Sequence, residues 1–459
     1  MEYKHEMQEL FCDIAVFGAG PSGIVAALAA ARNGSDVLLI EKSECLGGNL
    51  ISGLPLLGFL DKQGQQVVGG IAQEIIDRLT EQNACLGHNR CALHNSVTII
   101  DPEKTKILLF DMCREANVRL LLACAAVKTK TKDKNIECVF VNGKGHNYKI
   151  KAKLYIDSTG DGDVAYLSGA AMEKGQEKTG VLQPPSLLFM LTGFNEDEFF
   201  HYLEQHPKDL VASESMQVSK GYDLPYFRSH PGYVFLGLRD TLSRFAKLGI
   251  SPLKRDTLIY IKTTHPGQIC VNSTRILNYD GSQPEDITRG MAEAMLQIKE
   301  IHAFLKQYIP GFDRTYISHI NTTIGARETR RFHGLKRLTI EDVISGSIPN
   351  DTIALGSYKI DIHSGTGNST ILKELEEPYG IPLKCLISSD YGNLMLNGRC
   401  ISMDSSALAS MRVMPTCMAI GQSSGVCAAL AVQKDILPAQ VPVSEVVQIL
   451  QDEAAILMV

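Results

Sequence analysis

A glycine-rich segment near the start of the chain has the residue types and spacing that bind a pyrophosphate. It reads Gly18-Ala19-Gly20-Pro21-Ser22-Gly23, between an apolar stretch and an alanine-rich one. In such a segment the first glycine permits a tight turn, the second lets backbone amides approach phosphate oxygens, and the third allows close helix packing. Glu41 follows roughly 20 residues later, where an acid accepts hydrogen bonds from a ribose diol. The sequence therefore predicts a dinucleotide site at Gly18, Gly20, Pro21, Ser22, Gly23 and Glu41.

Three later segments favour FAD over NAD, which binds to the same kind of unit. A glycine pair follows Glu41 closely and lets the loop run against a pyrophosphate and a ribityl chain. A strand then ends in the small and acidic residues 157–163, and a helix start late in the chain supplies amides for the N1 and C2 carbonyl edge of a flavin. The residues predicted here to contact FAD are Lys42, Gly47, Gly48, Thr159, Gly160, Asp161, Met414, Pro415, Thr416 and Gly421.

Arginines and a histidine supply the candidates for substrate binding and proton transfer. Arg327, Arg330 and Arg331 lie within about two helical turns, and an arginine fork suits a substrate carboxylate. The alternative is that Glu328 and other acids neutralise these arginines in surface or interdomain ion pairs. The aspartate two residues before His363 can orient its ring for proton transfer. We predict Arg327, Arg330 and His363 as catalytic residues, with Arg330 and His363 on the substrate side of the flavin.

Cysteines and histidines recur at every third position from Cys85 to His94, but they do not match a metal site. Zinc ligands usually come in pairs, whereas these residues are evenly spaced. We therefore predict no metal and interpret the stretch as a surface insertion. The 12 cysteines of the chain include no CxxC pair, which argues against disulfide-reductase chemistry and against an iron–sulfur cluster within the chain.

The elements that position these residues follow from hydrophobic periodicity. Residues 12–17, 23–33 and 37–41 are predicted as strand, helix and strand, which is the βαβ unit of a parallel sheet. Helices are predicted at 70–81 and 101–116, the second opened by an Asp-Pro-Glu cap, and strands at 118–127, 136–141 and 148–156 predict a β-meander. A long helix at 285–309, a strand at 394–397 and a terminal helix from about 419 complete the pattern.

These elements predict an α/β protein with a discontinuous, Rossmann-like FAD-binding domain of the glutathione-reductase type and an inserted α+β substrate domain. The first part of the FAD-binding domain is expected at 1–195, with the β-meander at about 118–156. The substrate domain is expected at 196–389, where amphipathic helices alternate with polar loops, and residues 390–459 return to the FAD-binding domain. A chain of 459 residues exceeds the size of most single hydrophobic cores, which agrees with two domains.

Charge and hydropathy argue against several classes of partner. The formal net charge is −6, and the lysines at 128–134 alternate with threonines, so we expect no nucleic-acid partner. No run approaches the roughly 18 apolar residues of a membrane helix, and the first residues lack the apolar centre of a signal peptide. We therefore expect a cytoplasmic protein with reduced cysteines, a small-molecule substrate and no membrane partner. The oligomeric state, including a homo-oligomer, stays open.

Several segments resemble the FAD-dependent oxidoreductase family that is related in fold to the fumarate reductase and succinate dehydrogenase flavoproteins. The similarity extends over almost the whole chain and includes residues 157–163, 272–275, 325–331, 361–363 and 412–416. It implies bound FAD, a discontinuous flavin domain and an inserted substrate domain. Relatives with histidyl-linked FAD carry that histidine shortly after the first acidic residue, but residues 42–58 contain none, whereas Cys45 leaves a cysteinyl link open.

The predicted function is that of an FAD-dependent oxidoreductase that transfers a hydride between flavin N5 and a small metabolite, with an anionic substrate favoured by the arginines. No second glycine-rich nucleotide motif follows a strand in the sequence. Electrons are therefore expected to pass directly to or from the substrate, or to a separate electron donor or acceptor. A flavin-dependent monooxygenase and an electron-transfer flavoprotein subunit are the alternatives. The sequence leaves the substrate and the direction of reaction open.

Overall fold

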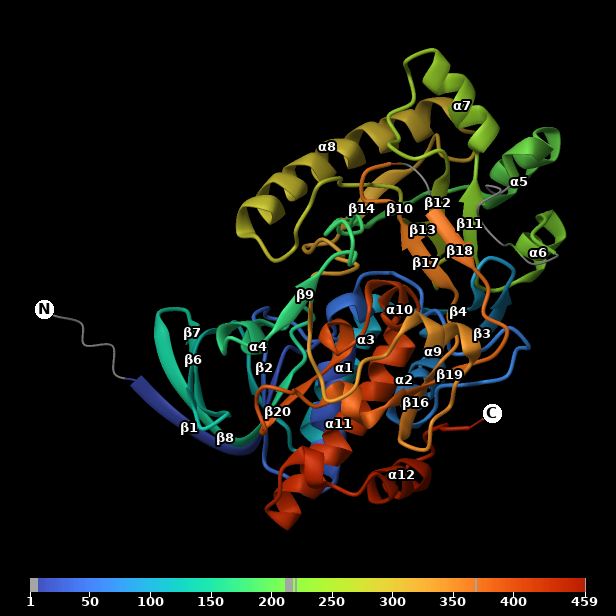
Figure 1. Ribbon diagram of the computed structural model, residues 1–459. Coiled ribbons are helices and arrows are strands. Elements are labelled where there is room, and N and C mark those ends of the chain that lie inside the picture. The colour runs from blue at the N-terminus through green and yellow to red at the C-terminus, as the bar shows by residue number, and fades with distance from the viewer. Residues whose placement is uncertain (1–6, 211–217, 219–220, 368–369, 459) are drawn as a thin grey trace, which may run out of the picture.

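The computed structural model describes residues 7–210, 218, 221–367 and 370–458, and its two main sheets are shown in Figure 1. The larger sheet has seven strands and contains segments from both ends of the chain. β1 pairs in parallel with β2 and β8, and β8 also pairs in parallel with the late strand β20. The strand order is β5 (Arg119–Leu121), β2 (Val37–Ile40), β1 (Met7–Phe17), β8 (His146–Asp157), β7 (Asn135–Gly143) and β6 (Ala125–Lys132), with β20 (Leu394–Leu396) beside β8.

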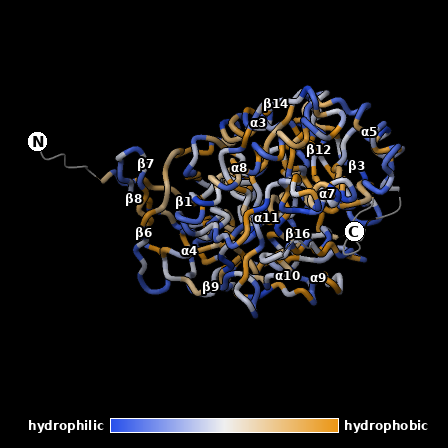
Figure 2. The backbone as a smooth tube through the Cα atoms, turned by 90° about the horizontal axis from the view of Figure 1, so that it is seen from above, coloured by the Kyte–Doolittle hydropathy of each residue, from blue (hydrophilic) through white to orange (hydrophobic). Residues whose placement is uncertain are grey.

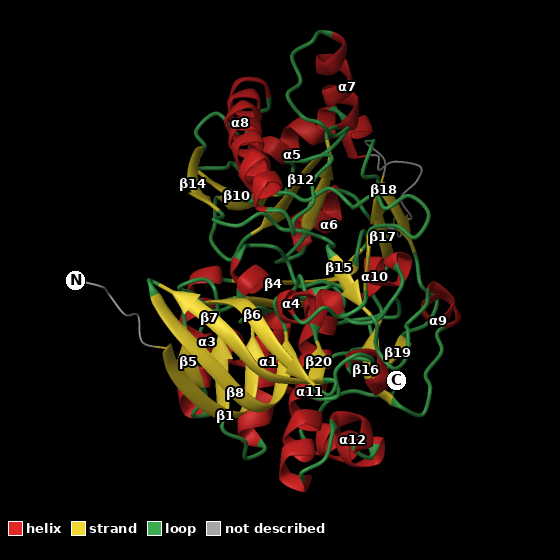
Figure 3. Ribbon diagram, turned by 60° about the vertical axis from the view of Figure 1, so that its left-hand side comes forward, coloured by secondary structure: helices red, strands yellow, loops and turns green. Residues whose placement is uncertain are grey.

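The predicted βαβ unit is confirmed at the start of this sheet. β1 leads through the glycine turn into α1, and β2 returns in parallel beside β1. The β-meander is formed by β6, β7 and β8, and the lysine-rich stretch is the mostly exposed strand β6 (Figure 3). The helices of this part of the fold are α1 (Pro21–Arg32), α2 (Gly70–Glu81), α3 (Pro102–Glu115), α4 (Asp163–Leu167), α9 (Ile340–Ser345), α10 (Ser405–Met411), α11 (Met414–Lys434) and α12 (Val443–Asp452).

The second sheet is five-stranded and antiparallel, and it lies with four helices at the top of Figure 1. Alternate residues of its strands face opposite sides: Phe235 and Tyr260 pack into a core with α8, whereas Val234 and Ile261 belong to another apolar cluster. The strand order is β11 (Val234–Gly237), β12 (Leu258–Lys262), β13 (Gln268–Val271), β10 (Phe189–Thr192) and β14 (Tyr316–Ile320). The helices are α5 (Glu196–Gln205), α6 (Leu224–Ser229), α7 (Arg239–Lys247) and α8 (Pro284–Tyr308).

Four antiparallel strand pairs lie outside the two main sheets, and one of them carries the predicted catalytic histidine. His363 is the last residue of β17. The pairs are β3 (Cys85–Cys91) with β4 (Asn95–Ile100), β9 (Met172–Lys174) with β15 (Arg330–Phe332), β16 (Thr352–Gly356) with β19 (Tyr379–Pro382), and β17 (Ile360–His363) with β18 (Thr370–Lys373).

The hydrophobic cores divide the chain differently from the predicted domain boundaries. Phe332, Tyr379 and Ile381 are buried in the same core as β1, α1 and α11, so residues 330–389 belong with the dinucleotide-binding domain. The core of the second sheet begins at Leu187, and its last apolar contact is the partly buried Ile324. The inserted domain therefore spans about residues 187–324, and the expected boundaries at 196 and 389 are corrected.

The central helix α11 crosses α1 at very short range. A Cβ added at Gly421 would lie 2.4 Å from the carbonyl oxygen of Ser22, and one added at Gly425 would lie 2.3 Å from that of Ala26. α11 begins at Met414, earlier than the predicted start near 419, because a proline fits the first turn of a helix, where no amide hydrogen is needed. The two glycines therefore serve the packing of α11 on α1.

Among the described residues, α11 is also the helix that is long and apolar enough to cross a membrane by length and composition. However, 89% of the apolar window is buried inside the fold. In Figure 2, α11 is seen near the centre of the view, and hydrophilic stretches are common at the rim. Such burial is typical of a core helix.

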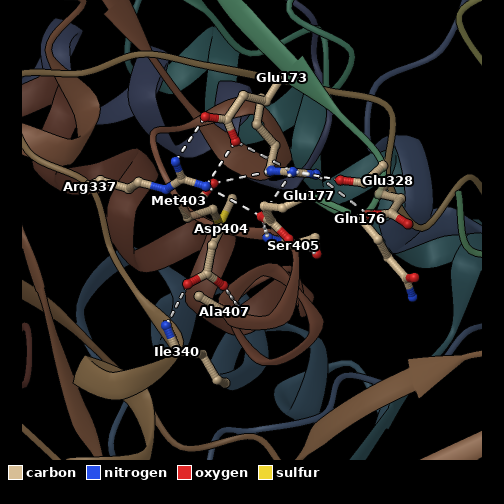
Figure 4. A network of polar contacts seen from close by, with 12 residues as sticks. Glu173, Gln176, Glu177, Glu328, Arg337, Ile340, Met403, Asp404, Ser405 and Ala407 are labelled. Atoms are coloured by element: carbon tan, nitrogen blue, oxygen red, sulfur yellow. Dashed lines mark hydrogen bonds and ion pairs between the residues drawn. The ribbon is translucent and has the colours of Figure 1, made fainter. Parts of the chain in front are cut away.

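The segment 325–331, which carries three arginines, is irregular and leads into β15. Arg331 is buried there and donates from Nε to the carbonyl oxygen of Met403 at 3.1 Å. Its guanidinium lies 3.5 Å from Glu177, 3.6 Å from Glu328 and 3.9 Å from Glu173, three acids that Figure 4 shows close together. Arg331 is therefore neutralised by nearby acids, which is the alternative that the sequence left open.

Candidate functional site

The glycine-rich segment forms a tight turn between β1 and α1. Gly18 has a φ of 92°, and a Cβ added there would lie 2.4 Å from the carbonyl oxygen of Ser158. A Cβ added at Gly23 would lie 1.8 Å from the carbonyl oxygen of Gly18, so neither position admits a side chain. No described atom lies within 4 Å of a Cβ added at Gly20. The space beside the start of α1 is therefore open, and the positive end of the helix dipole, with Pro21 in the first turn, is directed toward it.

Glu41 follows β2, and its carboxylate turns back to the glycine turn. The Ala19 amide donates to Oε2 at 2.6 Å, and the Ser43 amide donates to Oε1 at 2.8 Å. These bonds hold both oxygens in place, and each oxygen retains a lone pair that can accept a ribose hydroxyl. The geometry is compatible with the predicted role of Glu41.

The loop after β2 closes one side of the open space. Gly47 and Gly48 have φ values of 115° and 52°, which favour glycine. A Cβ added at Gly48 would lie 3.0 Å from the Cα of Gly20, and the Gly47 amide donates to the Ala19 carbonyl oxygen at 2.8 Å. Lys42, a further predicted FAD contact, is exposed. The loop thus brings the glycine pair against the glycine turn.

The carboxyl end of β8 lies next to the glycine turn. Asp157 is buried, and burial raises its pKa to about 6. Its Oδ1 accepts hydrogen bonds from the amide and the hydroxyl of Thr159 at 3.1 and 2.8 Å. Asp161 pairs with Arg399 at 3.1 Å, and a Cβ added at Gly160 would lie 2.8 Å from Nη2 of the same arginine. This turn therefore positions Arg399.

The start of α11 supplies further polar groups. In the described part of the chain no side chain caps this helix, so its first amides are available to a ligand. Met414 lines the cavity described next, and the hydroxyl of Thr416 is buried without a described hydrogen-bond partner. The prediction that Gly421 contacts the flavin is wrong, because this residue faces the backbone of α1 at Ser22.

A cavity of about 180 Å³ lies between the dinucleotide-binding domain and the inserted domain. The first domain contributes the segment after Gly48 and the start of α11, and the inserted domain contributes β11 and β12. Such a position between domains is typical of a substrate site. The polar and charged residues that line the cavity are Asn49, Ser52, His94, Ser186, Arg255, Asn272, Arg327, Tyr358, Asp361, His363, Thr370, Arg399 and Arg412.

Three of the cavity arginines interact electrostatically with one carboxylate group, that of Asp361. Nη2 of Arg412 donates to the Asp361 carbonyl oxygen at 2.8 Å and lies 3.6 Å from Oδ2. Burial, and then the nearby charge of Arg412, lower the pKa of Arg327 to about 9. Burial, and then a neighbouring arginine, lower the pKa of Arg255 to about 10. Because Asp361 is the only carboxylate among the described residues that line the cavity, the cavity carries net positive charge.

His363 is buried, and both of its ring nitrogens have partners. Nε2 lies 3.1 Å from Asp361 Oδ1, and Nδ1 lies 3.0 Å from Thr370 Oγ1. Since a carboxylate only accepts, Nε2 carries the proton and Nδ1 accepts from the threonine hydroxyl. Burial, and then Arg327, lower the pKa of His363 to about 3, so the ring is neutral at pH 7. Burial would raise the pKa of Asp361, but His363, Arg412 and Arg327 hold it well below its usual range.

Arg330 lies outside the cavity, and its predicted place on the substrate side is wrong. Its Nη1 binds Asp163 at 2.9 Å and the Asp161 carbonyl oxygen at 3.2 Å. Its guanidinium also lies 4.0 Å from the centre of the Tyr166 ring. β15 thus directs this side chain toward α4, whereas Arg327, three residues earlier, reaches the cavity.

The stretch with regularly spaced cysteines and histidines is not a surface insertion. It forms β3 and the turn into the buried strand β4, and His94 lines the cavity. The His88 ring contacts the Thr98 hydroxyl at 2.7 Å and Gln73 Oε1 at 3.0 Å. Burial lowers the pKa of His94 to about 4. Within the described ranges, no group of three or more His, Cys, Asp or Glu side chains is arranged to hold a metal.

Sequence reasoning missed several cavity residues. Arg412 stands in the segment 412–416, which resembles the flavoprotein family, and Arg399 follows the predicted strand at 394–397 by two residues, so the sequence offered a signal for both. Arg255, Tyr358 and Thr370 follow no motif. They enter the cavity only because the inserted domain and the β17–β18 pair fold over it.

Buried polar atoms around the cavity test whether the site fits FAD. Nη1 of Arg399, Nη1 of Arg412 and Oγ1 of Thr416 are buried and have no hydrogen-bond partner within the described residues. Buried donors of this kind require acceptors, and the carbonyl and phosphate oxygens of FAD are suitable ones. Together with the open space beside Gly20, these groups fit a dinucleotide that carries a flavin.

The fold and the site define a flavin-dependent oxidoreductase, and comparison with known proteins agrees. Residues 13–450 match the family of FAD dependent oxidoreductases, and the chain belongs to this family. It is therefore an FAD-binding enzyme with a Rossmann-like sheet.

Individual relatives share only parts of the chain or only the fold. Thiamine thiazole synthase of Thermococcus kodakarensis is 27% identical over 37% of this chain, and the match spans 64% of that relative, less than two thirds of its length. An uncharacterised protein of Methanosarcina barkeri, encoded in the nifH2 5' region, is 30% identical over 37% of this chain and 94% of its own. A geranylgeranyl bacteriochlorophyll reductase-like structure from Thermoplasma acidophilum has a TM-score of 0.50 at 11% identity, covers 98% of this chain and 85% of its own, and shows a shared fold.

Proposed function

We propose that this enzyme transfers a hydride between FAD and a small anionic metabolite bound in the cavity between its domains. The observation that carries the proposal is the excess of positive charge, since Arg255, Arg327 and Arg412 face Asp361 as the sole carboxylate among the described lining residues. Buried cations without a counterion are unfavourable. A substrate carboxylate would supply the missing negative charge and accept hydrogen bonds from the guanidinium forks.

FAD, when bound, takes up or releases the hydride at its N5 atom. In this proposal Gly20 and the start of α1 bind the pyrophosphate, and Glu41 binds a ribose. Arg399, Arg412 and the first amides of α11 bind the polar edge of the flavin. The helix start and the arginines would stabilise the negative charge that the ring gains on reduction.

The accompanying proton is assigned to the Thr370–His363 pair. In the direction of oxidation, a hydride leaves a substrate carbon and a proton leaves the neighbouring heteroatom. That proton passes to the Thr370 hydroxyl as the hydroxyl proton passes to Nδ1 of His363, 3.0 Å away. A bound anion offsets the positive field of Arg327 and thereby raises the pKa of His363. Asp361 then stabilises the doubly protonated ring.

The proposal also includes a relationship to the fumarate reductase and succinate dehydrogenase flavoproteins and a separate electron partner. The resemblance of segments 325–331 and 361–363 to the fumarate reductase and succinate dehydrogenase flavoproteins is supported by the arginines and the histidine in the cavity. A separate redox protein or small electron carrier would return FAD to its starting state after each turnover.

The test is anaerobic mixing of the purified yellow protein with a panel of carboxylate metabolites and neutral analogues. We expect one carboxylate class to bleach the flavin, and we expect Arg327→Lys to slow this reduction at least about tenfold with an unchanged oxidised spectrum. Arg337→Lys is the control, because Arg337 pairs with Glu173 outside the cavity. Reduction by neutral compounds alone, or a normal rate in Arg327→Lys, would contradict the proposal. Bleaching by NAD(P)H followed by an oxygenated product would instead indicate a monooxygenase.

A further inference from the structure

Part of the cavity lining is an aliphatic surface that belongs to an apolar cluster distinct from the two domain cores, and this cluster also includes residues of β3 and β4. Val234, Leu236 and Ile261 of β11 and β12 form an apolar cluster with Leu188 and Leu372, and all five side chains line the cavity. The opposite faces of the same strands fill the aromatic core of the inserted domain. The aliphatic surface is therefore built on a rigid sheet, whose own core lies on the other side.

The inserted domain supplies both kinds of lining. Arg255 precedes β12, whose Ile261 belongs to the aliphatic surface, and Val234 and Leu236 lie on the neighbouring strand β11. Arg399, Arg412 and Met414 of the dinucleotide-binding domain complete the lining. A ligand between the domains thus meets guanidinium groups and a hydrocarbon surface together. Water is poorly accommodated by such a surface, whereas alkyl groups are stabilised by it.

We infer that the substrate is an aliphatic carboxylic acid whose carboxylate binds Arg255 and Arg327 and whose hydrocarbon part packs on Val234, Leu236 and Ile261. This inference rests on the proposed function and adds the chemical class of the substrate to it. A purely polar acid would place polar atoms against the apolar part of the cavity wall. A neutral hydrocarbon would leave the arginines without a counterion.

The first experiment measures binding to the FAD-loaded protein by isothermal titration calorimetry. The ligands are straight-chain carboxylates from acetate to octanoate and the primary alcohols of equal length. Each added methylene contributes about 0.8 kcal/mol when buried, so we expect Kd of the carboxylates to fall about fourfold per carbon until the surface is covered. Kd that is independent of chain length overturns this inference while the anionic substrate stands. Equal Kd for alcohols and carboxylates overturns the anionic substrate, and carboxylates that do not bind at any length overturn both.

The second experiment uses a nearly isosteric change in the aliphatic surface. Val234→Thr places a hydroxyl among apolar side chains, and we expect octanoate to bind at least about fivefold more weakly while acetate binding and FAD content stay unchanged. Val271→Thr is the matched control, because Val271 lies in the same sheet but within the aromatic core. If Val234→Thr lowers FAD content and leaves the chain-length dependence intact, the surface contacts the flavin and the inference fails. The wild-type series decides the question alone if the variant is unstable.

Discussion

Arg327→Met is expected to stabilise the ligand-free fold and to weaken the binding of anions. Burial and the nearby Arg412 lower the pKa of Arg327 from 12.5 to about 9, so the native state disfavours its charged form. At 1.36 kcal/mol per pKa unit, this difference gives an upper bound of about 5 kcal/mol. The side chain is only partly covered and donates a hydrogen bond to the Pro184 carbonyl oxygen, which is lost in the variant. We therefore expect a net gain of about 1–2 kcal/mol and a rise in Tm of a few degrees.

The direction of the pKa change of Arg327 determines the pH at which the thermal unfolding should be measured. Because the native pKa of Arg327 lies below the unfolded one, the unfolded state binds more protons between about pH 9 and 12.5, and stability rises with pH there. The destabilising effect is complete below pH 9. Thermal unfolding of wild type and variant at pH 7.5, with and without a carboxylate ligand, therefore measures its full size.

A nearby arginine that is fully buried provides the comparison. Arg331 follows four residues later, but it is surrounded by Glu173, Glu177 and Glu328. Arg331→Met leaves Glu328 buried without its cation and should destabilise the fold by about 3–5 kcal/mol. Two results would contradict the inference that Arg327 is an uncompensated charge in the cavity. One is a Tm of Arg327→Met as far below that of wild type as the Tm of Arg331→Met, and the other is carboxylate binding by Arg327→Met as tight as that of wild type.

Three further predictions concern the nucleotide site, the histidine and the helix crossing. Gly23→Ala should abolish FAD retention and lower the yield of folded protein, because its Cβ would lie 1.8 Å from a carbonyl oxygen. Gly20→Ala should fold normally but retain less FAD. The ratio of flavin to protein absorbance checks both predictions. Carboxylate binding should raise the pKa of His363 above its ligand-free value of about 3, so proton uptake on binding should appear only at acidic pH and Kd should fall as the pH is lowered there. Calorimetry in buffers of different ionisation enthalpy measures this uptake. Gly421→Ala should lower Tm by several degrees and leave the flavin absorbance maximum unchanged, since its Cβ would lie 2.4 Å from the α1 backbone; a shifted maximum at unchanged Tm would contradict the packing role.

Local patterns in the sequence were sufficient for the nucleotide-binding half of the fold. The periodicity of residues 12–41 predicted β1, α1 and β2, and the cap at Asp101 predicted the start of α3. The role of the glycine turn could be predicted because neighbouring backbone atoms leave no room for a side chain at Gly18 and Gly23. The same reasoning failed at α11, where glycines that suit a flavin contact equally suit a helix crossing, and only the position of α1 distinguishes the two roles.

The sequence by itself determined the class of protein, since FAD binding depends on short-range backbone geometry between β1 and α1, with Glu41 at a fixed interval. It did not determine which arginines meet the substrate. Arg327, Arg330 and Arg331 are close in sequence, but the irregular segment and β15 direct them to different places. Arg327 reaches the cavity, Arg330 binds Asp163, and Arg331 lies beside the buried Glu328. The cavity also requires Arg255 and the aliphatic face of β11 and β12, which lie in an inserted domain far from His363 in the chain. Only the tertiary structure decides such a site, because its charge and shape arise where separate segments pack together.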